Sequence, residues 1–118
     1  MILRDAPYRV LWHVFRYGEN NHQLMLTPKS SLLLRILIMR TTAFSAGATL
    51  TIGAGTEVED LVTAAEAKLD TAVPAGLDAG CEEIVLNRYF ERVTPINMAL
   101  GGGPTAGQGI VLLEYVKL

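Results

Sequence analysis

The sequence is poor in cysteine and in charged residues, which several common functional classes require. Among its 118 residues it has one cysteine, and only 19% of its residues are charged. A lone thiol, Cys81, cannot close an intrachain disulfide, so a disulfide scaffold of an oxidising compartment is not expected. The charged fraction lies below the roughly 25% usual for soluble domains, whereas 50% of the residues are hydrophobic. This balance excludes an intrinsically disordered chain, which needs low hydrophobicity and high charge.

Clustered basic residues and long apolar runs are also absent from the sequence. The net charge is −2 and the lysines and arginines are scattered singly, so no electrostatic footprint for nucleic acid is present. Residues 1–7 do not read as a signal peptide. The most apolar run, residues 32–39, is interrupted by Arg35 and is far shorter than the roughly 20 residues that span a bilayer. We expect no nucleic-acid partner, no membrane, and a location in the cytosol or in a particle assembled there.

Apolar side chains are more numerous than one small core easily hides. A chain of this length is expected to form one domain, here residues 1–118. Because charged residues are depleted at subunit interfaces, the apolar surplus predicts a homo-oligomer.

Alternating apolar residues predict strands separated by glycine, proline and asparagine turns. In residues 8–17 the even positions from Tyr8 to Val14 share one face, and the odd positions share the other. Further strands are expected over residues 22–26, 32–42, 48–52, 81–87, 89–100 with a break near Pro95, and 108–117. Such regular spacing predicts an all-β fold, an antiparallel β-sandwich of jelly-roll-like type.

Residues 32–42 (LLLRILIMRTT) are apolar on both faces of an extended strand. Strict alternation places Leu32, Leu34, Ile36 and Ile38 on one face and Leu33, Arg35, Leu37 and Met39 on the other. A strand of this kind lies centrally in a sandwich or is covered by a neighbouring subunit. A buried helix is the alternative, since leucine and methionine favour helices, but the flanking turns and terminal threonines favour a strand.

One short helix is predicted near residues 57–68. Thr56 and Glu59 have the spacing of a capping box, and apolar residues from Val58 to Leu69 recur at helical spacing.

Motifs that would carry chemistry are incomplete. Gly53 and Gly55 follow a strand, but the third glycine of a dinucleotide fingerprint is replaced by Val58. His13 and His22 can meet in space, yet with Cys81 as the one soft third candidate they are too few for a structural zinc site. These patterns predict no metal and no cofactor.

Catalytic pairings are equally poor. Glu82 and Glu83 are adjacent on a strand, so they point to opposite faces and cannot act together as acid and base. No nucleophile elbow is present. We expect no enzyme activity and no small-molecule substrate.

Aromatic residues make up only 7% of the chain, but they concentrate in its first strand. Tyrosine and tryptophan fill cores and also anchor protein interfaces, and both readings apply here. We predict residues 1–20 as an interface strand or arm, together with a flexible glycine-rich loop over residues 101–107. The predicted interface residues are Tyr8, Trp12, Phe15, Tyr17, Gly101, Gly102, Gly103 and Pro104.

Residues 32–53 (LLLRILIMRTTAFSAGATLTIG) and 104–116 (PTAGQGIVLLEYV) resemble small virion structural proteins of tailed bacteriophages, of the capsid decoration or cement type. In these proteins an apolar strand leads into Thr-Thr-Ala-Phe and a Thr-Leu-Thr-Ile-Gly strand. These segments are followed by a connection outside the strands, such as residues 59–62, and then by a closing Gly-x-Val-x-x-x-Tyr strand. The resemblance covers roughly residues 24–117. It implies a homotrimer on the capsid surface that binds the major capsid protein and braces the head against internal DNA pressure.

Three functions are therefore considered. The first is a capsid decoration protein, assembled in the host cytoplasm, that self-associates and binds the capsid lattice. The second is a tail or head-fibre component of the virion. The third, from another class, is a small ligand-binding β-barrel with a polar-lined cavity.

Overall fold

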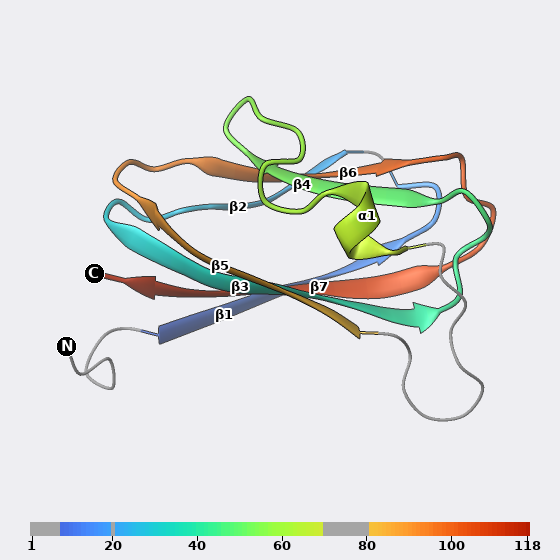
Figure 1. Cartoon of the computed structure of the whole chain (residues 1–118), viewed down its shortest axis with the longest axis horizontal. Helices are drawn as coiled ribbons and strands as arrows, with labels where there is room; N and C mark the ends of the chain where they lie inside the picture. Colours follow the sequence, from blue (N-terminus) through green and yellow to red (C-terminus); the bar gives the residue numbers. More distant parts are fainter. Residues whose placement is uncertain (1–7, 20, 70–80) are drawn as a thin grey trace.

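Seven strands and one helical turn form a two-layered β-sandwich in the computed structural model, which describes residues 8–19, 21–69 and 81–118 (Figure 1). The elements are β1 (Tyr8–Arg16), β2 (His22–Leu26), β3 (Ser31–Thr42), β4 (Thr49–Ala54), α1 (Ala64–Ala67), β5 (Cys81–Phe90), β6 (Pro95–Gly101) and β7 (Gln108–Lys117). The predicted antiparallel β-sandwich with one short helix is confirmed.

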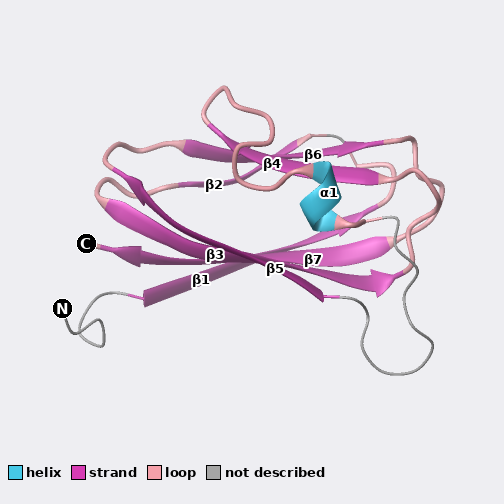
Figure 2. Cartoon of the chain, in the orientation of Figure 1, coloured by secondary structure: helices cyan, strands magenta, loops and turns pink. Residues whose placement is uncertain are grey.

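The two layers are a four-stranded sheet of order β1-β7-β3-β5 and a three-stranded sheet of order β2-β6-β4 (Figure 2). All strand pairs are antiparallel. Every consecutive pair of strands belongs to different sheets, so the chain crosses between the layers after each strand. This crossing brings β1 beside β7, the opposite ends of the sequence.

The core fills the space between the sheets with aliphatic and aromatic side chains. Its largest fully buried members are Phe15, Leu33, Ile36, Ile38, Leu50, Ile52, Val62, Leu69, Ile96, Met98, Val111 and Leu113. Phe15 of β1 stacks on Phe44, with ring centroids 5.5 Å apart. Such close packing in both layers fixes which face of each strand points inward.

Residues 32–42 form a strand, as predicted, but the strict alternation predicted for them is wrong. The pairing register of β3 shifts between Leu33 and Arg35 against both of its neighbours. This β-bulge inserts Leu34, so that Leu33 points into the core together with Ile36 and Ile38. Arg35, which follows the bulge, takes its place on the outer face.

The helix is confined to four residues, Ala64–Ala67, within the predicted region. Its capping box uses Thr63 and Glu66, and the predicted pair of Thr56 and Glu59 does not cap it. Residues 56–62 do not join the helix because they bond to β4 instead. The Asp60 carboxylate accepts a hydrogen bond from the backbone N–H of Ala54 at 2.9 Å, and Val62 forms a β-bridge with Ile52.

Candidate interaction surfaces

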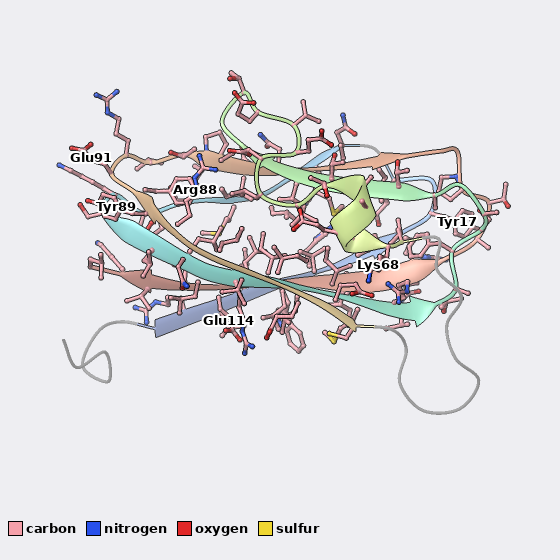
Figure 3. The ribbon with its side chains drawn as sticks, viewed as in Figure 1. Tyr17, Lys68, Arg88, Tyr89, Glu91 and Glu114 are labelled. Atoms are coloured by element: carbon pink, nitrogen blue, oxygen red, sulfur yellow. The ribbon has the colours of Figure 1, made fainter. Side chains whose placement is uncertain are left out.

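The outer face of the four-stranded sheet carries three rows of side chains that run across all four strands. Directly paired residues of antiparallel strands share a face, so the registers define each row. The rows are Val10-Glu114-Arg35-Val85, Trp12-Leu112-Leu37-Glu83 and Val14-Ile110-Met39-Cys81. We call these residues the apolar face. It lies on the lower side of the molecule in Figure 3, where Glu114 is labelled.

Large apolar side chains on this face are in contact with solvent. Trp12 is 69% exposed, and Val85, at the opposite edge, is 63% exposed. Val10 and Val14 flank Trp12 and are 50% and 51% exposed. Several large exposed apolar side chains gathered on one face of a sheet mark an interaction site more often than apolar residues scattered singly do.

Three charged groups lie within the apolar face, Arg35 and Glu114 in its first row and Glu83 in its second. The Arg35 guanidinium donates two hydrogen bonds to the Glu114 carboxylate and also bonds to Glu83. These two carboxylates raise the pKa of Arg35 above its usual range, so the guanidinium stays charged. Because one cation is shared by two anions, the group carries one excess negative charge.

Cys81 lies at the end of the third row, beside Met39. Partial burial raises the pKa of its thiol above its ordinary value, and Glu82 and Glu83 add to the shift. The thiol is therefore neutral at pH 7, which makes it a poor nucleophile.

The structure separates the predicted aromatic interface residues. Trp12 lies on the apolar face, whereas Phe15, on the opposite face of β1, is 0% exposed and belongs to the core. Phe15 therefore offers no surface to a partner. Tyr8 begins β1 opposite Val116, and its side chain lies outside the described part.

Tyr17 lies at the same end of the sandwich as the predicted glycine-rich loop, on the right in Figure 3. Its backbone N–H donates to the carbonyl of Gly107 at 3.0 Å. The loop between β3 and β4 closes the same end, since the backbone N–H of Thr105 donates to the Ser45 hydroxyl at 2.9 Å. We call Tyr17 and residues 101–107 the glycine end.

Gly102 has a structural requirement for glycine that Gly103 does not fully share. Both have a positive φ, but a Cβ at Gly102 would lie 1.9 Å from the carbonyl oxygen of Gly47, and one at Gly103 would meet nothing within 4 Å. We expect Gly102→Ala to lower the free energy of unfolding by at least about 2 kcal/mol, and Gly103→Ala by about 1 kcal/mol. Urea denaturation of the two variants measures both. Equal losses would contradict the close approach at Gly102.

No direct signal in the sequence indicated that Leu37, Leu112, Val85 and the ion-paired side chains around Arg35 form one surface. Arg35 and Glu114 are 79 residues apart, and their pairing depends on the order of the strands. A single glutamate within the apolar strand β7 was the one visible hint.

Other chemistry-bearing residues do not converge on a site. The rings of His13 and His22 stack with centroids 4.3 Å apart, as their predicted meeting requires. Within residues 8–19, 21–69 and 81–118, no three His, Cys, Asp or Glu side chains are placed to hold a metal ion. Glu82 pairs with Arg40 and Lys68 while Glu83 pairs with Arg35, so the two adjacent carboxylates point apart, as predicted.

A hollow of about 330 Å³ lies on the outer side of the three-stranded sheet, beneath the loop that follows β4. Polar side chains line much of it, including His22, Gln23, Glu57 and Asn97. Asn97 donates to the carbonyl of Gly55 at 3.3 Å, which ties the loop to β6.

No helix among the described residues is long and apolar enough to cross a membrane.

Comparison with known proteins finds similarity in structure alone. No protein-family model matches the sequence, and no curated protein matches it. A chain in the acid-stable capsid structure of Helicobacter pylori bacteriophage KHP30 superposes with a TM-score of 0.68 at 10% identity, over 94% of this chain and 88% of that one. A chain in the capsid asymmetric unit of cyanophage Pam1 gives 0.67 at 12% identity, over 96% and 86%. At these identities the likeness shows that the fold is shared.

Proposed function

We propose that this chain is a structural protein of a bacteriophage virion, a capsid decoration or cement protein that self-associates and binds the major capsid protein lattice. The observation that carries the proposal is the exposed apolar face. An enzyme would need converging reactive groups, whereas this surface offers shape and apolar area. The shared fold with chains from two phage capsid structures supports the virion setting.

The strand connectivity supports the same setting. Apart from one consecutive pair that shares a sheet, successive strands of a jelly roll alternate between its two sheets as these strands do, and jelly rolls recur in viral capsid domains. Residues 55–69 follow β4 at the place where an eighth strand would extend the three-stranded sheet. Only the bridge between Ile52 and Val62 is formed there.

The free energy available at the apolar face is large enough for association. A tryptophan buries roughly 150–250 Å² when it is fully covered. At about 25 cal/mol per Å², covering the 69% of Trp12 that is exposed contributes about 3 kcal/mol. The valines and leucines of the same rows add to this, which offsets the entropic cost of joining two chains.

Lattice binding requires a second surface that stays free after self-association. We assign this role to the glycine end, which comprises Tyr17, 44% exposed, and the loop of residues 101–107 that it bonds at Gly107. A trimer would present three such ends to the lattice. Several modest contacts then act together through avidity, so no single contact has to be tight.

Mass spectrometry of purified particles tests the proposal. The chain should be found in intact virions and also in heads purified without tails. Its presence in tails or fibres alone would favour the second candidate, a tail or head-fibre component. Its absence from every particle would contradict a virion role.

A ligand-binding β-barrel has less support. The sheets remain two separate layers, and the space between them is filled by the apolar core. The polar hollow lies outside the sandwich, over the three-stranded sheet.

A further inference from the structure

The turns that join β2 to β3 and β5 to β6 lie at the end of the sandwich opposite the glycine end, on the left in Figure 1. They carry a second group of exposed apolar side chains, which we call the second patch. Leu26 and Val93 are 55% and 59% exposed there. Backbone hydrogen bonds hold their segments together: Thr27 N–H donates to the carbonyl of Thr94 at 2.8 Å, and Ser30 N–H to that of Glu91 at 3.2 Å. The patch is therefore a fixed surface built from two tied turns.

Basic side chains surround this patch. Lys29, Arg92 and Lys117 are all exposed and lie within the tied segments or at the adjoining end of β7, which pairs with Ser31. Glu91 is the one acidic side chain among them. We call Leu26, Val93 and these three basic residues the basic end.

The basic end complements the apolar face in both chemistry and charge. Each surface is apolar, which favours burial. The basic end has three cationic side chains against one anionic side chain, and the apolar face has one cation, Arg35, against Glu83 and Glu114. Two apolar faces would bring like charges together, and so would two basic ends. A face and an end bring opposite charges together.

We infer that the basic end of one copy docks on the apolar face of the next, in a head-to-tail contact. This inference rests on the self-association proposed above and names the two surfaces that perform it. Unlike surfaces form a heterologous interface, which closes into a ring when the rotation permits. Since strand ends and a sheet face point in directions roughly at right angles, successive copies turn sharply. A small closed ring is therefore favoured over a straight filament.

Both surfaces expose apolar side chains that a contact would cover. Trp12 and Val85 of the apolar face are 69% and 63% exposed, and Leu26 and Val93 of the basic end are 55% and 59% exposed. Removing these side chains from water favours the contact.

Complementary blocked variants test the inference. Trp12→Glu blocks the face and leaves the basic end intact, whereas the double variant Leu26→Glu with Val93→Glu blocks the end and leaves the face intact. Each variant alone is expected to be a monomer by light scattering. Mixed in equal amounts, they are expected to form a one-to-one dimer, because one intact face meets one intact end. Circular dichroism verifies that each variant is folded.

Each other outcome of this experiment contradicts a different claim. If the end-blocked variant keeps the wild-type mass, the end is not a contact and the inference fails while self-association stands. If both variants are monomers and the mixture stays monomeric, the two surfaces do not bind each other, and the head-to-tail contact is overturned. A monomeric wild-type protein would instead contradict the self-association in the proposed function.

Discussion

Replacing Trp12 by glutamate is expected to reduce the protein in solution from an oligomer to a monomer of 12.8 kDa. The side chain is 69% exposed, so its removal from the isolated chain costs the fold little. Association loses the burial of the ring, about 3 kcal/mol, which alone is a factor of more than 100 in the dissociation constant. The new carboxylate also adds to the excess negative charge of Glu83 and Glu114. Light scattering after size exclusion, across a range of protein concentrations, measures the change.

Val58→Glu is the matched control for this variant. Val58 is 64% exposed, close to the exposure of Trp12, but it lies on the loop after β4, away from the apolar face and the basic end. The control should keep the wild-type mass. If Trp12→Glu also keeps it, the apolar face is not the contact. If Trp12→Glu unfolds the chain, Trp12 has a structural role that its exposure does not explain.

The strands of the sandwich could be predicted because the pattern that identifies each strand lies within that strand's own residues. Alternation within residues 8–17 and the two-faced pattern of residues 32–42 identify strands without knowledge of their partners. The bulge at Leu34 was missed because it exists only relative to β5 and β7, and alternation within one strand does not contain it.

Tertiary contacts decide where the helix starts, because the sequence contains two capping boxes of equal spacing. Thr56 with Glu59 and Thr63 with Glu66 have the same capping-box spacing. The second pair caps the helix because Leu61 and Val62, which precede it, are both buried, and Val62 is bridged to Ile52. A helix starting at Thr56 would break these contacts with β4.

The candidate surfaces were predictable only in part. Periodicity placed Trp12 and Phe15 on opposite faces of one strand, but it did not say which face is covered. That depends on β1 lying at the edge of the four-stranded sheet, beside β7 from the other end of the chain. The charged group of Arg35, Glu83 and Glu114 depends on the same strand order.

The second large effect is expected on the free energy of unfolding, from a substitution on the inward face of β1. Phe15→Ala is expected to lower the free energy of unfolding by about 3–5 kcal/mol, the usual range for removing a buried phenylalanine ring. The ring is 0% exposed, stacks on Phe44, and lies so close to Gly109 that a Cβ there would be 2.7 Å from it. A loss of this size is a large share of the roughly 5–15 kcal/mol that stabilises a typical domain.

Urea denaturation should be measured in the Trp12→Glu background, because association of the folded chain raises its apparent stability. Val14→Ala is the control on the same strand. Its side chain is 51% exposed on the apolar face, so it should cost less than about 1 kcal/mol in this monomeric background. The ratio between the two variants tests the inward and outward assignment of β1 directly. Equal losses would mean that both faces of β1 are buried in the monomer, and the apolar face would then not be available to a second copy.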